Sequence, residues 1–257
     1  MSQFIDRLNR VSRVTPQAMG FRVTRLVPEK PRILLIASLA GAGAGGLANY
    51  VAGADAGLLR IPKLSPGAKT LKEISQAAPD IPWGGWLRDI NEGGIKQMAK
   101  AGCDFVVFPA ANTPLALPQN DEVGKVLEVE SSLSDGLLRT ANELPVDAVL
   151  IASGQEGEHF LTWHHLMLFQ HFADLLTKPL LASTPPDVTA NELLALWKAG
   201  VDGVVIEAEA GQPVDRLKEL RQAIDKLVFP SQRKREKAEA LLPHIDSEVS
   251  IVAEDED

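Results

Sequence analysis

The sequence predicts an α/β fold in which parallel strands alternate with helices. A four-residue phrase ending in Asp recurs along the chain; its copies are Ala52-Gly53-Ala54-Asp55, Ala101-Gly102-Cys103-Asp104, Ala199-Gly200-Val201-Asp202 and the degenerate Leu144-Pro145-Val146-Asp147. Each copy ends an apparent helix at Gly or Pro, and a short apolar run typical of a strand follows it. Strict alternation of strands and helices with short connections forces parallel pairing, because each crossover returns the chain to the same end of the sheet.

The pattern contains enough units to close the sheet on itself. Predicted strands lie at 33–38, 57–61, 81–87, 104–109, 125–130, 147–152, 179–183 and 203–208. Predicted helices lie at 44–53, 67–78, 91–101, 114–122, 134–144, 160–176, 189–199 and 213–227. The Asp phrases precede every second strand, so the repeating unit is βαβα. Over residues 33–228 the chain therefore resembles the TIM-barrel superfamily, the (β/α)8 fold, in its architecture.

The two ends of the chain lie outside this barrel. Residues 1–32 are predicted to form an N-terminal helical cap, because Phe4, Ile5 and Leu8 follow helical spacing with arginines on the other faces. This amphipathic helix either packs under the barrel or lies on a membrane surface or a partner. Residues 229–257 read as a charged extension that ends in an acidic tail.

Composition restricts the partners and the compartment. A net charge of −8 argues against a nucleic-acid binder, because neutralising phosphates requires a basic surface. Cys103 is the only cysteine, so no internal disulfide requires an oxidising compartment. No apolar run approaches the ~20 residues that span a bilayer. We expect a cytoplasmic protein with a small-molecule ligand that forms a homo-oligomer, with Cys103 as a small buried residue at a strand's beginning.

Charged residues inside strands mark the candidate site, which in this fold lies at the C-terminal ends of the strands. Side chains alternate along a strand, so Glu128 and Glu130 share one face and point into the barrel. Glu207 does the same in the eighth strand. Arg60, in the second strand, is the natural counter-charge for Glu128, Glu130 or Glu207, because an unpaired carboxylate inside a barrel is costly.

These charges admit a functional and a structural interpretation. In the functional one, Glu130 and Glu207 act as a general acid and base or as ligands of a divalent metal, while Arg60 or Lys63 holds an anionic substrate. In the structural one, the charges form a buried ionic network that fills the barrel centre. His159 follows the sixth strand and is the best histidine for acid–base work.

Two further motifs follow predicted strands. Trp83-Gly84-Gly85-Trp86 is expected to end the third strand, where Trp83 and Trp86, with Arg88 beyond them, would contact the substrate while the glycines let backbone approach it. Gly41, Gly43 and Gly46 form a GxGxxG pattern after the first strand, which predicts a dinucleotide-binding loop or a mobile loop over the site.

The sequence thus favours an enzyme of the lyase or isomerase type that acts on a small anionic organic metabolite. Its chemistry would be carboxylate acid–base or divalent-metal catalysis, with FMN or NAD(P) as less favoured cofactors. One alternative is a flavin- or nicotinamide-dependent oxidoreductase that uses the glycine loop. Another is a catalytically silent barrel that serves as a scaffold or interaction protein.

Overall fold

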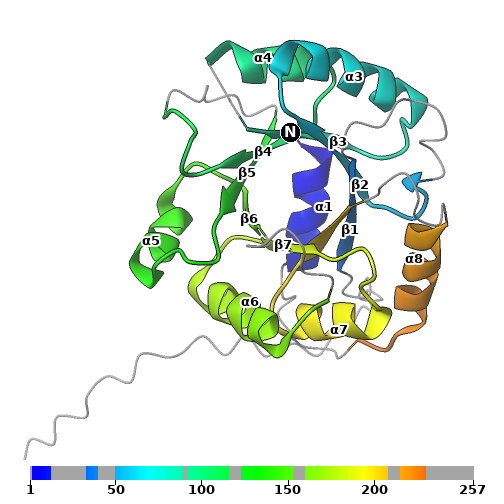
Figure 1. Ribbon diagram of the computed structural model, residues 1–257, viewed down its shortest axis with the longest axis vertical. Helices are drawn as coiled ribbons and strands as arrows, with labels where there is room; N and C mark the ends of the chain where they lie inside the picture. Colours follow the sequence, from blue (N-terminus) through cyan, green and yellow to red (C-terminus); the bar gives the residue numbers. More distant parts are fainter. Residues whose placement is uncertain are drawn as a thin grey trace, which may run out of the picture.

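Parallel strands form a closed barrel in the computed structural model, which describes residues 2–12, 33–39, 50–88, 92–115, 123–152, 160–207 and 215–229. The strands are β1 (Leu34–Leu39), β2 (Ala56–Ile61), β3 (Trp83–Leu87), β4 (Phe105–Pro109), β5 (Gly124–Val129), β6 (Ala148–Ile151), β7 (Leu180–Thr184) and β8 (Gly203–Glu207). Each strand pairs with the next in sequence order, and β8 pairs with β1 to close the ring (Figure 1). The predicted (β/α)8 architecture is confirmed.

Helices surround the strands on the outside (Figure 1). Their bounds are α3 (Leu64–Ala77), α4 (Glu92–Lys100), α5 (Asp135–Thr140) with the 3-10 turn η1 (Ala141–Glu143), α6 (Trp163–Leu175), α7 (Ala190–Lys198) and α8 (Arg216–Lys226). In the predicted helix at 114–122, the two described residues are not helical and the rest lie outside the described ranges, as does most of 44–53. Within the described residues, no helix has the length and apolar character needed to span a membrane.

Two apolar cores follow from the alternation of side chains along the strands. One face of each strand packs outward against the helices, as Leu35 and Ala37 of β1 do. The other face fills the barrel interior, where Ile36 of β1 meets Leu58 of β2 and Val205 of β8. The interior therefore holds packed side chains, as in other barrels of this type.

The repeated Asp phrase builds the junctions at the beginnings of the strands. The backbone N–H of each Asp donates a 2.8 Å hydrogen bond to a carbonyl of the preceding strand, the acceptors being Leu35, Trp83, Lys125 and Leu180. In three copies the carboxylate returns the contact by accepting the N–H of that same residue; these bonds are Leu35 to Asp55, Lys125 to Asp147 and Leu180 to Asp202. The glycine of the phrase has φ between 86° and 101° in its three copies, a conformation that favours glycine.

The remaining carboxylate, that of Asp104, binds the N-terminal helix instead. It accepts the Ser2 hydroxyl at 2.7 Å and the backbone N–H groups of Gln3 and Phe4 at 2.8 and 2.9 Å. These N–H groups belong to the first turn of α1 (Gln3–Ser12), where a helix lacks internal acceptors and favours negative charge. Asp104 thus caps α1 from another element.

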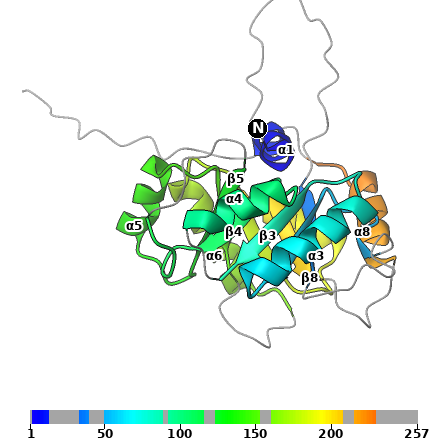
Figure 2. The same ribbon diagram turned by 90° about the horizontal axis from the view of Figure 1, so that it is seen from above.

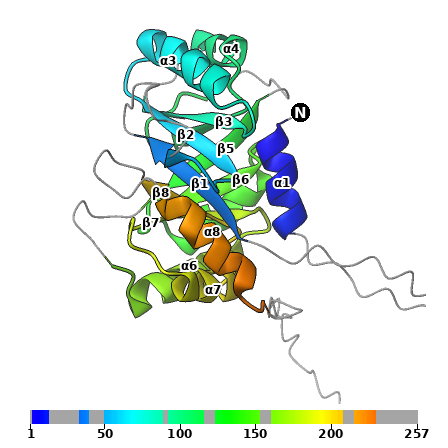
Figure 3. The same cartoon turned by 90° about the vertical axis from the view of Figure 1, so that its right-hand side faces the viewer.

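Helix α1 closes the end of the barrel at which the strands begin (Figures 2 and 3). Phe4 and Leu8 are fully buried in the interior core, and the Phe4 ring stacks on Phe105 with 4.2 Å between centroids. The apolar face predicted for this helix therefore packs under the barrel, and it is not available to a membrane or partner.

Of the Trp83-Gly84-Gly85-Trp86 motif, which was expected to end the third strand, Trp86 lies next to the last residue of β3, but the prediction is wrong for Trp83, which is its first residue. The glycines make room for neighbouring side chains. A Cβ on Gly84 would lie 2.4 Å from the Phe105 ring, and one on Gly85 would lie 2.8 Å from the Met98 side chain. The motif thus fills space between strands, and its backbone does not line an open ligand site at these two positions.

Candidate active site

The C-terminal end of the barrel, opposite α1, collects polar side chains from several strands. We call Arg60, Trp86, Glu128 and Glu207 the mouth cluster. Each continues the inward-facing series of its strand, which for β2 runs through Ala56 and Leu58 of the interior core. This is the end at which barrel enzymes of this kind carry their chemistry.

Arg60 and Glu207 form an ion pair between a terminal guanidinium nitrogen (Nη2) and Oε1. Ser38 of β1 is in register with Glu207 of β8 on one side and with Leu58 of β2 on the other. The pair therefore bridges across β1, and it confirms Arg60 as a counter-charge for one of the predicted carboxylates. The two side chains are 40% and 34% exposed, and a pair this accessible to water contributes only about 0–1 kcal/mol to stability.

Trp86 and Glu128 support the guanidinium from the other side. The Arg60 Cζ lies 4.8 Å from the centroid of the Trp86 ring, within the range of a cation–π contact. The Trp86 indole N–H donates a 2.7 Å hydrogen bond to Glu128 Oε2. Arg60 and Trp86 are also register partners on β2 and β3, so the ring and the guanidinium lie on adjacent strands.

The other predicted charged residues lie nearer to solvent. Glu130 follows the end of β5, is exposed and accepts a 3.3 Å hydrogen bond from the Ser132 hydroxyl. Lys63 is exposed and precedes the first residue of α3, and Arg88 is exposed directly after β3. All three follow strand ends, so they lie on the mouth side without belonging to the mouth cluster.

Sequence reasoning missed Ser38. This residue is 1% exposed on the inward face of β1, and its Oγ is buried without a hydrogen-bond partner among the described residues. The Arg60 Nε is buried and unpartnered in the same way. The signal was present in the alternation of Leu34, Ile36 and Ser38 along β1.

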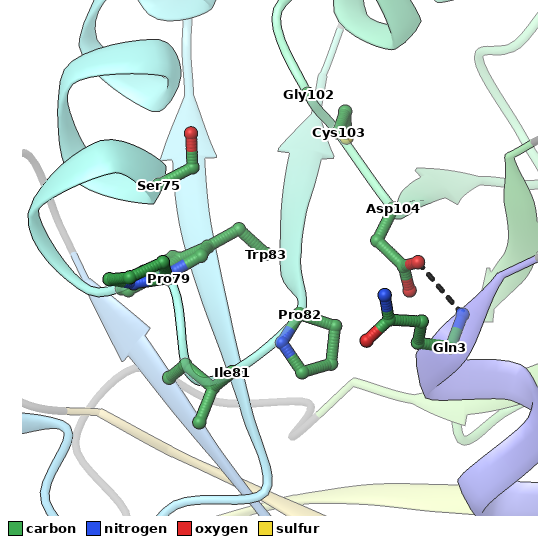
Figure 4. A pocket seen from close by; sticks show the side chains of 9 residues that line it. All are labelled: Gln3, Ser75, Pro79, Ile81, Pro82, Trp83, Gly102, Cys103 and Asp104. Carbon is green, nitrogen blue, oxygen red and sulfur yellow. Dashed lines mark hydrogen bonds between the residues drawn. The ribbon is translucent and has the colours of Figure 1, made fainter.

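Trp83 lies at the other end of the molecule and takes no part in the mouth. The residue is 2% exposed in the outer core, and its indole N–H donates to the Ala78 carbonyl at 2.8 Å. It also lines a cavity of about 330 Å³ beside α1, with Asp104 and Gln3 (Figure 4). Trp83 lies at this end because it is the first residue of β3, and the strands begin at the end that α1 closes.

Cys103 lines that same cavity and is buried, as predicted. Its Sγ lies 3.0 Å from the Phe105 carbonyl oxygen, to which the thiol donates. Burial raises the pKa of the Cys103 thiol to about 12, because the thiolate would lose its hydration. The thiol is therefore protonated at neutral pH and unsuited to nucleophilic chemistry.

Several predicted residues lie outside the described ranges, namely His159, Gly41, Gly43 and Gly46. Within those ranges, no group of three or more His, Cys, Asp or Glu side chains comes together as a metal site requires. The predicted divalent-metal ligands Glu130 and Glu207 thus have no third ligand in the described part of the chain.

No protein-family model and no curated protein matches the sequence. Solved structures match its fold. A mutant tryptophan synthase α-subunit from Pyrococcus furiosus is 14% identical over 75% of this chain and 96% of that one, with a TM-score of 0.58. The chain is a TIM barrel.

Two further barrels show the same level of likeness. Thiamine phosphate pyrophosphorylase from Pyrococcus furiosus is 16% identical, covers 75% of this chain and 96% of its own, and has a TM-score of 0.57. Tryptophan synthase from Mycobacterium tuberculosis is 15% identical over 75% of this chain and 91% of its own, with a TM-score of 0.55. At such identities the likeness is one of fold.

Proposed function

We propose that this TIM barrel is an enzyme of the lyase or isomerase type that acts on a small anionic organic metabolite. The observation that carries the proposal is the mouth cluster, in which one guanidinium lies between Glu207 and a Trp86–Glu128 pair at the C-terminal end of the barrel. The neighbours in fold are named for enzymes, which supports the same class.

The chemistry proposed for the mouth is proton transfer between carboxylates and the ligand. Glu207 and Glu128 come from opposite sides of Arg60, so a ligand at the guanidinium would have a carboxylate on each side. Glu130 follows β5 two residues beyond Glu128, and we retain it as a third candidate acid–base group. Arg60 would hold the negative charge of the ligand, with Lys63 and Arg88 attracting it from solvent.

The test is the consumption of metabolites by the full-length protein. The purified chain is incubated with a mixture of small organic acids and phosphate esters, and mass spectrometry follows each compound over time. We expect at least one anionic compound to be converted, and Glu207→Gln or Glu128→Gln to slow that conversion by about 10²–10⁴-fold, the usual contribution of general acid–base catalysis.

Glu219→Gln is the matched control, because Glu219 is an exposed carboxylate on α8. It should convert the compound at the wild-type rate. A protein that converts nothing would favour the scaffold alternative. A flavin absorbance spectrum in the purified protein would instead favour the oxidoreductase. Oligomeric state and the exclusion of nucleic acid remain predictions.

A further inference from the structure

Two buried donors at the mouth have no partner among the described residues, namely the Ser38 hydroxyl and the Arg60 Nε–H. Buried polar groups in proteins are nearly always hydrogen-bonded, so such a pair calls for an explanation. We propose that a ligand carboxylate binds to Arg60 and Ser38, and that it does so by replacing Glu207 as the partner of Arg60. This inference rests on the proposed function and names its substrate class as small carboxylic acids.

The two donors lie on neighbouring strands, β1 and β2, at the same end of the barrel. Ser38 on β1 is in register with Glu207 on β8, and the Arg60–Glu207 pair spans β1 from β2. Ser38 therefore faces the interior where the pair crosses its strand. Because Glu207 occupies the neighbouring Nη2 of Arg60, a ligand carboxylate would take its place once the Glu207 side chain has moved away.

The Arg60–Glu207 ion pair can break while Arg60 keeps its other contacts. Arg60 and Glu207 are each more than a third exposed, and an exposed pair is readily exchanged for another anion. The guanidinium keeps its contact with the Trp86 ring, and Glu128 keeps that ring oriented through the indole N–H. Arg60 is thus positioned without any help from Glu207.

The geometry of the donors favours a carboxylate over a phosphate. Glu207 uses Nη2 of Arg60 and leaves Nε unpartnered, whereas a ligand carboxylate in its place can accept from both nitrogens of that planar edge. The Ser38 hydroxyl supplies a further donor. Glu128, Glu130 and the displaced Glu207 add three negative charges at this end, which disfavour a doubly charged phosphate over a singly charged carboxylate.

The exchange also makes Glu207 available as a base. Once released from Arg60, its carboxylate lies beside the bound ligand and is free to take a proton from it. Binding of the acid would therefore prepare the base, and the exchange of one carboxylate for the other on Arg60 makes and breaks no covalent bond.

The test is isothermal titration of the full chain with propionate, with propionamide as the uncharged match and inorganic phosphate as the competing anion, at constant ionic strength. We expect propionate to bind, propionamide not to bind and phosphate to bind more weakly. Arg60→Gln should weaken propionate binding by at least about tenfold, and Ser38→Ala by about threefold, as expected for a charged and a neutral hydrogen bond. Arg139→Gln, which changes an exposed arginine on α5, should leave binding unchanged.

Glu207→Gln separates the exchange from simple anion attraction. This variant removes the competitor from Arg60, so it should bind propionate several times more tightly, although the proposed function predicts that it is catalytically impaired. Weaker binding in Glu207→Gln, tighter binding of phosphate than of propionate, or unchanged binding in Arg60→Gln would each overturn the inference. Absence of propionate binding would overturn it too, while conversion of another metabolite that depends on Glu128 would leave the proposed function standing.

Discussion

Arg60 shows how one side chain can organise several others. Its guanidinium pairs with the Glu207 carboxylate through Nη2, and its Cζ lies 4.8 Å from the centroid of the Trp86 ring. A lysine has no planar edge or face, so Arg60→Lys would keep the charge and lose this arrangement. The identity of the residue therefore matters here as much as its charge.

Cys103 gives a prediction at the scale of one residue. In the folded chain the pKa of its thiol is raised to about 12, so the folded state holds its proton where the unfolded state releases it. This contribution to stability is complete below the unfolded pKa and is lost as the pH rises from about 9 towards 12. At pH 10 the loss is on the order of 1 kcal/mol.

The measurement is the free energy of unfolding in urea at pH 7 and pH 10, for the wild type and for Cys103→Ala. We expect the wild type to lose more stability between these values than the variant does. A thiol reagent should label Cys103 only after unfolding. Equal pH dependence in both proteins, or rapid labelling of the native chain, would show that the thiol is accessible to solvent.

At the scale of elements, the strand junctions repeat one hydrogen-bond pattern in different surroundings. Asp147 and Asp202 both accept the N–H of a residue in the preceding strand, but Asp147 is exposed and Asp202 is fully buried. If the carboxylate is removed, water can take its place at the Asp147 junction but not at the buried Asp202 junction. The same motif should therefore have different energetic importance along the chain.

Asp202→Ala is expected to lower the free energy of unfolding by about 1–3 kcal/mol, because it leaves the buried Leu180 N–H without this acceptor. Asp147→Ala should cost less than about 1 kcal/mol, since solvent reaches that junction. Urea denaturation of both variants measures the difference. Equal losses would mean that the contribution of the Asp to the free energy of unfolding does not depend on its burial.

At the scale of the whole molecule, the two ends of the barrel have opposite characters. The end where the strands begin is closed by α1 and packed with apolar side chains, whereas the opposite end carries the mouth cluster. Asp104 connects α1 to the barrel, because it belongs to a strand junction and also caps that helix. A barrel closed at one end can stabilise the fold there and leave the other end for binding.

Phe4→Ala tests the closure. Phe4 is fully buried and stacks on Phe105, so its truncation should leave a cavity and cost about 3–5 kcal/mol. Arg10→Ala, on the exposed face of the same helix, is the control and should change stability by less than about 0.5 kcal/mol. An unaffected Phe4→Ala would show that α1 is dispensable for the fold.

The order of the strands, their parallel pairing and the inward face of each could be predicted from the sequence, whereas the helix expected at 114–122 is not formed at its two described residues. These depend on local properties: a side-chain period of two, glycine at a turn and Asp at a junction. Glu128 and Glu207 were assigned to the barrel interior in this way, and the structure places both in the mouth cluster.

Which side chains meet could not be predicted without the closed barrel. Arg60 and Glu207 are 147 positions apart in the chain, and they pair because closure of the barrel sets β8 beside β1. The same closure made Glu128 the partner of Trp86, left Glu130 exposed and placed Trp83 at the far end from the mouth. Periodicity gives the face of a strand on which a residue lies, but contacts between strands also depend on register and closure, which no local pattern contains.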